Sequence, residues 1–400
     1  MNAALLVLNA GSSSLKFAVY PADREANGDP LCRGLLDGIG GSGQLRVFPA
    51  ANAPASRELE KSEQDVAAED HRHALYLVLD WLERNYADLK LVAAGHRVVH
   101  GGMHYSAPVM VDEAVLGALE SLIPLSPLHQ PHSLAGIRAL AALRPGLPHV
   151  ACFDTAFHRT MPDLAQRFAL PRELVELGIR RYGFHGLSYE YIAARLPDYL
   201  ADGADGRVVV AHLGNGASLC AMRGRRSIET SMSFTPLDGI PMGTRCGALD
   251  PGVLLYLMRE QGMDEPALSN LLHYRSGLLG LSGLSGDVRE LLHSDRPEAA
   301  QALDLFTYRI AQAVAGLAAA LGGLDALVFT AGIGEHAAPV RLAICQRLDW
   351  LGLSMDEAAN ARQGPRISKP DSRVSAWMIP TDEESVIARH TRAFIGHDAR

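Results

Sequence analysis

The chain has 400 residues, of which 48% are hydrophobic and 20% charged, and its formal net charge is −8. This length exceeds what one hydrophobic core ordinarily serves, so we expect two domains. An acidic chain lacks the basic face that nucleic-acid binding requires. No apolar run reaches the roughly 18 residues of a membrane helix, and the N-terminal apolar run is too short for a signal peptide. We therefore expect a cytoplasmic protein that binds neither nucleic acid nor a membrane.

Cysteine usage agrees with a reducing compartment. The five cysteines are widely spaced and include no C-x-x-C pair; they are Cys32, Cys152, Cys220, Cys246 and Cys345. An odd number without a framework predicts neither disulfides nor a structural zinc site.

Two similar hairpins are expected about 200 residues apart. An apolar strand at 5–8 leads through the turn NAGSSS into a second strand at 15–20. The same pattern recurs at 208–222, where VVVAHL, GNG and ASLCAM follow one another. Strands that meet at small, hydrogen-bonding turn residues favour hairpins. Their repetition predicts a duplicated domain.

A third pattern, at 326–348, predicts a strand, a glycine-rich turn and an amphipathic helix with Val340, Ile344 and Leu348 on one face. Further helices are expected at 74–86 and 304–321, and the segment 20–72 is expected to be turn-rich and irregular. A Pro/Gly break predicts a domain boundary near 150. The segment 229–252 has no clean period, and so long a loop in a compact domain usually binds something.

The glycine- and serine-rich turns suit anion binding, because backbone N–H groups and hydroxyls can converge where no Cβ blocks the approach. Taken singly, each is more often an ordinary tight turn. The third turn, GIGEHA, also matches a dinucleotide-binding fingerprint, but no acidic strand end follows about 20 residues later. No G-x-x-x-x-G-K-[ST] motif occurs, which excludes a P-loop kinase.

Several polar residues in loops are candidates for chemistry. Arg97 precedes a Gly-Gly turn and Arg245 lies in the long loop, where a guanidinium suits carboxylate or phosphate but could equally form a solvated salt bridge. A structural role is the default for His185, between an aromatic residue and a glycine. Asp154 follows a strand, where open α/β sheets place ligands. Thr381 and Glu384 form an apparent capping box, which leaves Glu383 for other work.

Taken together, these motifs resemble those of the acetate kinase family. In chain order they are VLNAGSSSLKF, RVVHGG, FDTAFH, RYGFHGLS, HLGNGAS, FTPLDGIPMGTRCGALDPG, SGLLGLSGLSGDVRE, FTAGIGE and PTDEE, from residue 7 to 384. The resemblance implies an α/β fold of two ribonuclease-H-like, actin-like ATPase domains with a cleft between them. It implies an N-terminal domain at 1–150, with a C-terminal helix at 384–400 packing back on it. It also implies a nucleotide-binding, dimerising domain at 151–383.

The resemblance further implies an acetate kinase. Such an enzyme transfers phosphate directly from ATP to acetate, giving acetyl phosphate and ADP, with Mg²⁺ or Mn²⁺ as cofactor, and it forms a homodimer. Residues implied in catalysis are Asp154, His185 and Arg245. Those implied to bind the substrate are Arg97, Val99, Leu128, Phe184 and Pro236. Those implied to bind ATP are Lys16, His212, Leu213, Gly214, Asn215, Gly216, Asp287, Val288, Arg289, Gly332, Ile333, Gly334, Glu335 and His336. Asn9 and Glu383 are implied to hold the metal.

This sequence departs from the family pattern at a few positions. His336 and Asp382 stand where asparagine is common, LHQPHS replaces an L-H-N-P pattern at 128–133, and Tyr189 replaces a histidine. Ser233 replaces a glycine.

Two other functions stay open. One is a propionate or butyrate kinase, since one methylene changes binding by only about 1–3 kcal/mol. The other is a chaperone or filament ATPase of the same superfamily, which would need a peptide-binding domain or a polymer surface.

Overall fold

The computed structural model describes residues 2–23, 29–49 and 62–396. The chain folds as two compact units, the first formed by Met1–Ala156 with Asp382–Arg400 and the second by Phe157–Thr381. The boundaries therefore fall after 156 and 381 rather than near 150 and after 383. Strand β8 pairs within the first sheet, and Asp382 caps the returning helix, so both remain with the first unit.

The first unit contains an eight-stranded sheet in the order β5-β4-β3-β2-β1-β6-β8-β7. Its strands are β1 (Asn2–Ala10), β2 (Ser14–Pro21), β3 (Cys32–Asp37), β4 (Gly41–Pro49), β5 (Ser62–Ala68), β6 (Leu89–Val98), β7 (Val109–Met110) and β8 (His149–Phe153). Strands β1, β6 and β8 are parallel, whereas β1 to β5 form an antiparallel meander.

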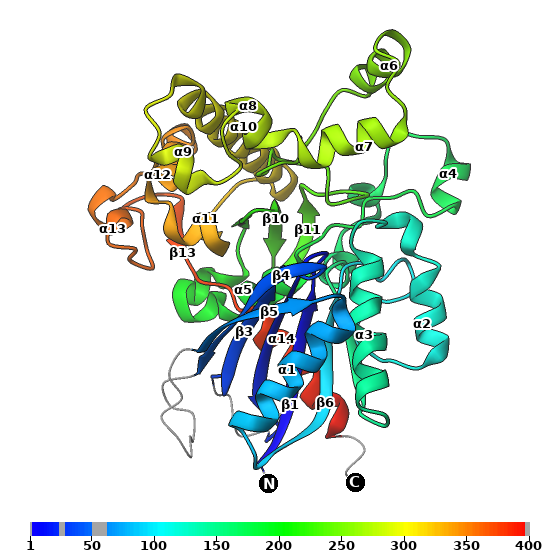
Figure 1. The fold of residues 1–400 in the computed structure, drawn as a ribbon. Coiled ribbons are helices and arrows are strands. Elements are labelled where there is room, and N and C mark those ends of the chain that lie inside the picture. Colours follow the sequence, from blue (N-terminus) through cyan, green and yellow to red (C-terminus); the bar gives the residue numbers. More distant parts are fainter. Residues whose placement is uncertain (1, 24–28, 50–61, 397–400) are drawn as a thin grey trace. The chain divides into compact units, whose positions relative to one another are not determined.

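Helices cover both faces of this sheet (Figure 1). They are α1 (His71–Asn85), α2 (Glu113–Glu120), η1 (Ile123–Leu125), α3 (Gln130–Leu143) and α14 (Glu383–Ile395). Leu6 and Leu8 share a buried core with apolar residues of α1 and α3. On the other face, a Cβ at Gly95 of β6 would lie 2.3 Å from Thr391 Oγ1 of α14. A glycine is therefore needed where α14 approaches the sheet.

The second unit repeats the central part of this topology. Its five-stranded sheet has the order β11-β10-β9-β12-β13. The strands are β9 (Val208–Leu213), β10 (Ala217–Arg223), β11 (Arg226–Thr230), β12 (Ala326–Thr330) and β13 (Ser375–Met378). As with β3-β2-β1-β6-β8, an antiparallel meander adjoins two parallel strands. The two expected hairpins are present, and the repeated strand order agrees with a duplicated domain.

Helices also cover the second sheet. The α-helices are α4 (Arg172–Glu176), α5 (Gly186–Leu200), α6 (Pro251–Glu260), α7 (Glu265–Tyr274), α8 (Gly277–Ser282), α9 (Val288–Leu292), α10 (Pro297–Leu321), α11 (Ala331–His336), α12 (Ala338–Gln346) and α13 (Glu357–Ala361). Short 3₁₀ helices lie at η2 (Ala156–Thr160), η3 (Asp163–Gln166), η4 (Ala201–Asp205) and η5 (Asp349–Leu351). Helix α5 buries Ile192 and Leu196 against Val208 and Val210 of β9.

Three local expectations need correction. The segment 20–72 is not irregular where it is described, since it contains β3, β4 and β5; residues 24–28 and 50–61 lie outside the described part. The third glycine-rich turn is a short helix, α11, and Leu348 lies just beyond α12 but is buried. Helix α14 is capped by the Asp382 side chain, which accepts from the Ser385 N–H, so the capping box at Thr381 was wrong.

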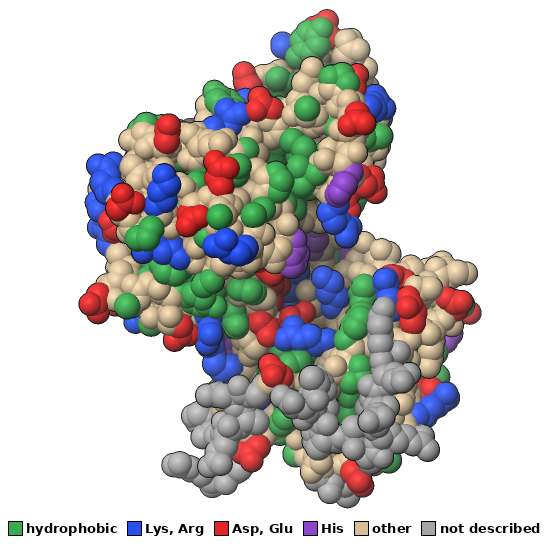
Figure 2. Space-filling view, turned by 90° about the vertical axis from the view of Figure 1, so that its left-hand side faces the viewer, with side chains coloured by type: hydrophobic (Ala, Val, Ile, Leu, Met, Phe, Trp, Pro, Cys, Tyr) green, Lys and Arg blue, Asp and Glu red, His purple; other side chains and the backbone are tan. Residues whose placement is uncertain are grey.

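The expected helices are present as α1 and α10, and the segment between β11 and α6 is a loop without helix or strand. Within the described ranges, no helix has the length and apolar character needed to cross a membrane. Figure 2 shows acidic, basic and hydrophobic side chains interspersed on one face of the molecule. None of the five cysteines, all of which lie in the described ranges, forms a disulfide.

Candidate active site

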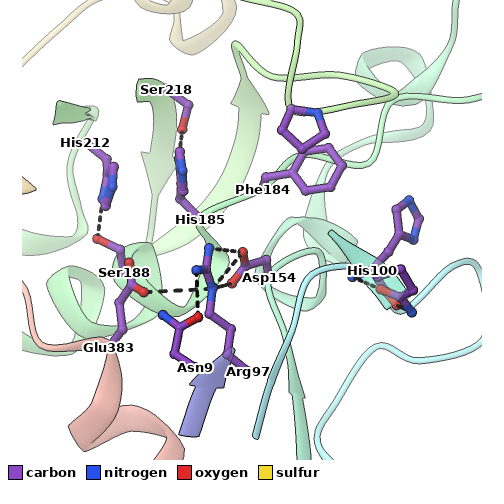
Figure 3. Close-up of polar contacts among 12 residues, drawn as sticks. Asn9, Arg97, His100, Asp154, Phe184, His185, Ser188, His212, Ser218 and Glu383 are labelled. Atoms are coloured by element: carbon purple, nitrogen blue, oxygen red, sulfur yellow. Dashed lines mark hydrogen bonds and ion pairs between the residues drawn. The ribbon is translucent and has the colours of Figure 1, made fainter. Parts of the chain in front are cut away.

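In the first unit, polar residues gather where the three parallel strands end (Figure 3). Asn9 lies near the end of β1, Arg97 near the end of β6, and Asp154 directly after β8. The carboxyl ends of parallel strands meet at one edge of a sheet, which is where such folds place ligands. Glu383, the first residue of α14, joins this cluster: its Oε2 lies 4.0 Å from Arg97 Nε. Four residues far apart in sequence thus share one edge.

Arg97 and Asp154 form a forked ion pair. Arg97 Nε lies 3.0 and 3.1 Å from the two carboxylate oxygens of Asp154, and Nη2 donates to Oδ2. Arg97 Nη1 donates to Asn9 Oδ1 at 3.3 Å. Asp154 is 1% exposed. Burial opposes the charge of Arg97, but Asp154 and Glu383 outweigh it and raise the pKa of Arg97 above its ordinary value. These bonds use three of the five guanidinium N–H groups, which leaves one on each of Nη1 and Nη2 for an anion.

Glu383 lies in a buried setting between charges of both signs. Burial raises the pKa of Glu383 to about 7; Arg97 opposes this rise, Asp154 and Glu384 add to it, and Lys16 opposes it. Lys16 lies opposite Asn9 in the β1–β2 ladder, so the two side chains share one face. Like charges that raise a carboxyl pKa create a potential that a divalent cation would relieve.

The donors fit a magnesium ion held jointly with a substrate. Asn9 and Glu383 offer an amide and a carboxylate oxygen, and Mg²⁺ typically uses one or two carboxylates together with phosphates and waters. Within the described ranges, no group of three or more His, Cys, Asp or Glu side chains could hold a metal by itself.

Sequence reasoning missed Arg33, which holds the segment around Glu383. Its guanidinium pairs with Asp382 on one side of Glu383 and with Glu384, at 3.2 Å, on the other. It also donates to Tyr20 Oη at 3.3 Å. One cation thus fixes both neighbours of Glu383 at the start of α14. Asp382 stands where the family pattern commonly has asparagine, and its additional negative charge is paired with Arg33.

Val99 and Leu128, the expected apolar substrate contacts of this unit, lie on adjacent loops. Gln130 connects them: its Oε1 accepts from the His100 N–H, and its Nε2 donates to the His100 carbonyl, each at 3.1 Å. Gln130 is fully buried. Gln130 departs from the family pattern at 128–133. It fixes the loop after β6 to the start of α3.

In the second unit, a strained turn presents His185. His185 is a non-glycine residue with a φ of 58°, next to Phe184 and to Gly183 with a φ of 80°. A Cβ at Gly183 would lie 2.6 Å from the His158 ring. His158 Nε2 lies 2.9 Å from the Phe184 carbonyl and its Nδ1 lies 2.9 Å from Ser227 Oγ. Strained backbone of this kind persists where surrounding contacts enforce it, often at active sites.

His185 stacks on His212, with ring centroids 4.2 Å apart and planes at 19°. Each ring contacts a serine hydroxyl through Nδ1: His185 binds Ser218 at 2.9 Å and His212 binds Ser188 at 2.8 Å (Figure 3). Neither serine was expected from the sequence. The pair of rings is thereby fixed beside the hairpin turn that joins β9 and β10.

The turn at 214–216 has glycines where these groups approach. A Cβ at Gly216 would lie 3.2 Å from Arg245 Nη2 and 3.3 Å from His185 Nε2. Arg245 Nη1 donates to the Pro236 carbonyl at 2.8 Å, which fixes the long loop on itself. Arg245 and His185 therefore flank Gly216. Phe184 and Pro236, the other expected substrate contacts, are buried in this unit.

The expected nucleotide segments of this unit lie beside the same turn. A Cβ at Gly214 would lie 3.8 Å from Ala331 at the start of α11, and a Cβ at Gly243 would lie 2.5 Å from Asn215 Oδ1. A Cβ at Gly243 would also lie 3.1 Å from the carbonyl oxygen of Gly286, next to the expected segment 287–289. Asp287 caps α9 and pairs with the exposed Arg289. The remaining residues of α11 are Gly332, Ile333, Gly334, Glu335 and His336.

Within α11, the Glu335 carboxylate is engaged by the backbone: it accepts from the N–H groups of Ala331 and Thr381 at 2.9 and 3.1 Å. Arg341, which the sequence did not single out, donates to the Gly334 and Glu335 carbonyls at 2.9 and 2.8 Å. It is fully buried, and Asn360 accepts two further bonds. Arg341 thus fixes the end of α11, and none of its hydrogen-bond partners among the described residues is a carboxylate.

These two clusters provide complementary chemistry. The first offers a guanidinium fork and hard oxygen ligands, whereas the second offers glycine turns, an arginine and two imidazoles. Guanidinium groups, imidazole N–H groups and converging backbone amides all stabilise phosphate oxygens. The set is typical of phosphoryl transfer, in which positioning and charge neutralisation dominate.

Comparisons with known proteins agree over the full chain. The acetokinase family profile matches residues 4–389. An acetate kinase from Rhodopseudomonas palustris is 54% identical over 394 residues, covering 98% of both chains. An acetate kinase from Methylocella silvestris is 50% identical, covering 99% of this chain and 98% of the relative.

Solved structures are similar as well. A propionate kinase from Francisella tularensis matches with a TM-score of 0.90 at 36% identity, covering 98% of this chain and 99% of the other. The Porphyromonas gingivalis acetate kinase matches with a TM-score of 0.86 at 37% identity, covering 98% and 100%. The expected fold class, α/β with two actin-like domains, is confirmed.

Proposed function

The chain belongs to the acetokinase family, and from this premise we propose that it is an acetate kinase, which transfers the γ-phosphoryl group of ATP to acetate and gives acetyl phosphate and ADP. The observation that carries the proposal is the full-length relation to acetate kinases. The forked Arg97 and the glycine-rich turns are of the kind that this chemistry needs.

We infer a direct in-line transfer. Acetate is already an anion at neutral pH, so it needs no general base. A carboxylate oxygen forms the new bond to the γ-phosphorus while the bond to the β,γ-bridging oxygen breaks. The obstacle is repulsion between an anion and a polyanion, which is overcome by positioning and charge. Arg97 binds the acetate carboxylate, with Asp154 orienting it. Arg245 and His185 bind the oxygens of the transferring group, and Lys16 adds positive charge.

Asn9 and Glu383 would hold Mg²⁺ (or Mn²⁺) together with the nucleotide phosphates. Such an ion, when bound, neutralises phosphate charge and orients the β- and γ-phosphates. The turn at 212–216, the segment 287–289 and α11 would hold the nucleotide. Val99, Leu128, Phe184 and Pro236 would enclose the methyl group of acetate.

A panel of C2 to C4 acids with Mg²⁺-ATP tests the proposal. The product is trapped with hydroxylamine, which converts an acyl phosphate into a hydroxamate, and ADP release is followed in parallel. We expect hydroxamate and ADP in equal amounts, with the highest kcat/KM for acetate. ATP turnover that is independent of any short-chain acid would refute the proposal and would favour an ATPase.

Propionate is the second candidate, because the similar Francisella structure is a propionate kinase. The extra methylene would need room beside the four apolar residues, and the discrimination expected from one methylene is about 10- to 200-fold. A propionate kcat/KM above that of acetate in the same panel would select this alternative.

We further propose a cytoplasmic homodimer. Helix α6 buries none of its residues, and its Leu255, Tyr256 and Met258 are 57%, 53% and 49% exposed. Apolar side chains grouped on one helix favour a protein contact. Light scattering coupled to size exclusion would give twice the chain mass of 42.9 kDa; a monomer at micromolar concentration would contradict this assignment.

A further inference from the structure

We propose that Ser218 and Tyr189 are positioning residues that hold His185 as a neutral imidazole with its proton on Nε2. In this state His185 acts on the transferring phosphoryl group as a neutral hydrogen-bond donor, rather than as a cation. The catalytic part of this inference rests on the proposed function, whereas the protonation state is a property of the free protein.

The inference starts from a chain of three groups, His185, Ser218 and Tyr189, of which the last two are buried. Ser218 Oγ lies 2.9 Å from His185 Nδ1 and 2.5 Å from Tyr189 Oη. Ser218 and Tyr189 are each fully buried. Ser218 lies on β10 and Tyr189 on α5, the helix that begins directly after His185. The sheet and the helix thus meet at one serine hydroxyl, which contacts the imidazole.

The direction of these hydrogen bonds follows from counting protons. A serine hydroxyl has one proton to donate and can accept others. Burial raises the pKa of Tyr189 well above its ordinary value, so the phenol keeps its proton. Across residues 2–23, 29–49 and 62–396, Ser218 is the only hydrogen-bond partner of the Tyr189 hydroxyl. A buried donor without an acceptor costs about 1–3 kcal/mol, so Tyr189 donates to Ser218.

The Ser218 hydroxyl then donates its own hydrogen bond to His185 Nδ1. Ser218 Oγ could accept from both groups, but its own proton would then have no acceptor among the described residues, at a cost of about 1–3 kcal/mol. Nδ1 therefore accepts, and an imidazole nitrogen that accepts is unprotonated. The ring proton therefore lies on Nε2. A protonated imidazole would carry N–H groups on both nitrogens, so Ser218 Oγ would accept from both Nδ1 and Tyr189 Oη, and the Ser218 proton would be left without an acceptor. The Ser218–Tyr189 pair therefore disfavours the protonated, cationic form of His185.

The surroundings of Nε2 agree with a neutral ring. His185 Nε2 and Arg245 Nη2 lie on either side of Gly216, within 3.3 and 3.2 Å of the position a Cβ would take. The stacked His212 ring has its centroid 4.2 Å away. A charged His185 would add a cation beside a guanidinium, which is unfavourable. A neutral Nε2–H instead provides a donor beside the turn that would hold phosphate.

His212 provides an internal comparison. Its Nδ1 contacts Ser188, and Ser188 contacts Thr381 Oγ1 at 2.9 Å. Thr381 is partly exposed, so its hydroxyl proton can be given to water. The direction of the hydrogen bonds around His212 is therefore not imposed. Of the two stacked rings, His185 is the one whose proton position is enforced.

Imidazole ¹⁵N NMR on the protein labelled with [¹⁵N]histidine, without substrates, tests the protonation state. The His185 signals are assigned by their loss in His185→Gln. We expect wild-type Nδ1 to be an unprotonated, accepting nitrogen and Nε2 to be protonated near neutral pH. In Tyr189→Phe, Ser218 is free to accept, so the Nδ1–H form becomes populated. A wild-type Nδ1 that carries a proton, or an unchanged ring in Tyr189→Phe, would overturn the inference.

Kinetics test the catalytic part. Tyr189→Phe should lower kcat by about tenfold, the effect of one hydrogen bond, with little change in KM for acetate or ATP. Ser218→Ala should lower kcat further. Tyr86→Phe is the matched control, since its hydroxyl donates to the Leu31 carbonyl in the first unit; we expect kcat and the His185 signals to stay unchanged. An equal loss of kcat in both tyrosine variants would show a merely structural role.

The two proposals fail separately. If the wild-type protein forms no acyl phosphate with any acid, the proposed function is wrong, yet the ¹⁵N spectrum still decides the proton position. If acetyl phosphate forms but Nδ1 is protonated, only the inference is wrong. If Ser218→Ala does not fold, Tyr189→Phe carries the test alone, because it removes one oxygen and leaves the packing unchanged.

Discussion

Replacing Asp154 by asparagine removes the charge that orients Arg97 while keeping the shape of the side chain. In the structure, both oxygens of this buried carboxylate accept from Arg97, through Nε and Nη2. An asparagine offers one acceptor oxygen, and its NH₂ group would face the guanidinium. If Asp154 acts by orienting Arg97, the variant should bind acetate poorly but should keep the pH dependence of the wild type.

The magnitude follows from the bonds involved. Hydrogen bonds to charged groups contribute about 1.5–3 kcal/mol, and those between neutral groups about 0.5–1.5 kcal/mol. Loss of charge on two bonds therefore costs about 2–3 kcal/mol, which corresponds to roughly 30- to 150-fold in kcat/KM. We expect most of this loss in the KM for acetate, because Arg97 would bind the acid.

Steady-state kinetics from pH 5.5 to 9, with acetate and ATP varied separately, measure this effect. Asp325→Asn is the matched control, since Asp325 forms a similar fork with Arg207 in the second unit, away from the proposed substrates. We expect its kinetics to be those of the wild type. A pH–rate profile of Asp154→Asn that lost a limb present in the wild type would refute the reasoning, because it would identify Asp154 as an acid or base.

Three further changes test other parts of the site. Gly216→Ala places a methyl group 3.2 and 3.3 Å from the flanking guanidinium and imidazole; kcat should fall about 10- to 100-fold with an unchanged Tm, whereas Gly316→Ala, which meets nothing within 4 Å, should keep full kcat. An unaltered kcat in the first variant would contradict the proposed roles of both flanking groups. Burial lowers the pKa of His158 to about 4, so the unfolded chain binds more protons below its ordinary value of 6.5. The contribution of neutral His158 to stability is complete above pH 6.5 and is lost as the pH falls towards 4. The destabilisation caused by His158→Asn should therefore be about 2 kcal/mol smaller at pH 5 than at pH 8 in urea titrations, and a pH-independent difference would contradict the burial of a neutral ring. Arg341→Lys loses the planar fork that holds α11; we expect a raised KM for ATP at a nearly unchanged KM for acetate, and equal changes in both would argue against a local effect.

The two hairpins illustrate what local sequence signals can predict. Each consists of apolar strands around a short glycine-bearing turn, and their hydrogen bonds join residues close in the chain. By contrast, the segment 20–72 is predicted to be turn-rich and irregular, yet it contains β3, in which Gly34 lies. A Cβ there would lie 2.3 Å from the Phe17 ring on the adjacent strand. The sequence alone does not distinguish a glycine needed for the close approach of a side chain from a glycine that forms a turn.

The start of α14 shows how tertiary contacts override a local pattern. Thr381 and Glu384 match a capping box, but Thr381 binds Glu335 and Ser188, and Glu384 pairs with Arg33. Asp382 caps the helix instead. Partners distant in the chain compete for these side chains, and no local pattern reveals them.

The sequence by itself predicted the repeated hairpins, because these depend on short-range periodicity. Its contiguous motifs carried the family resemblance, which in turn implied the class of fold and the types of residue that a carboxylate kinase would use. Only the tertiary structure decided which side chains meet. Asn9, Arg97 and Asp154 come together because β1, β6 and β8 run parallel and end at one edge. Ser218 and Tyr189 reach His185 because a sheet and a helix pack there, which is a long-range consequence of burial that spacing along the chain does not encode.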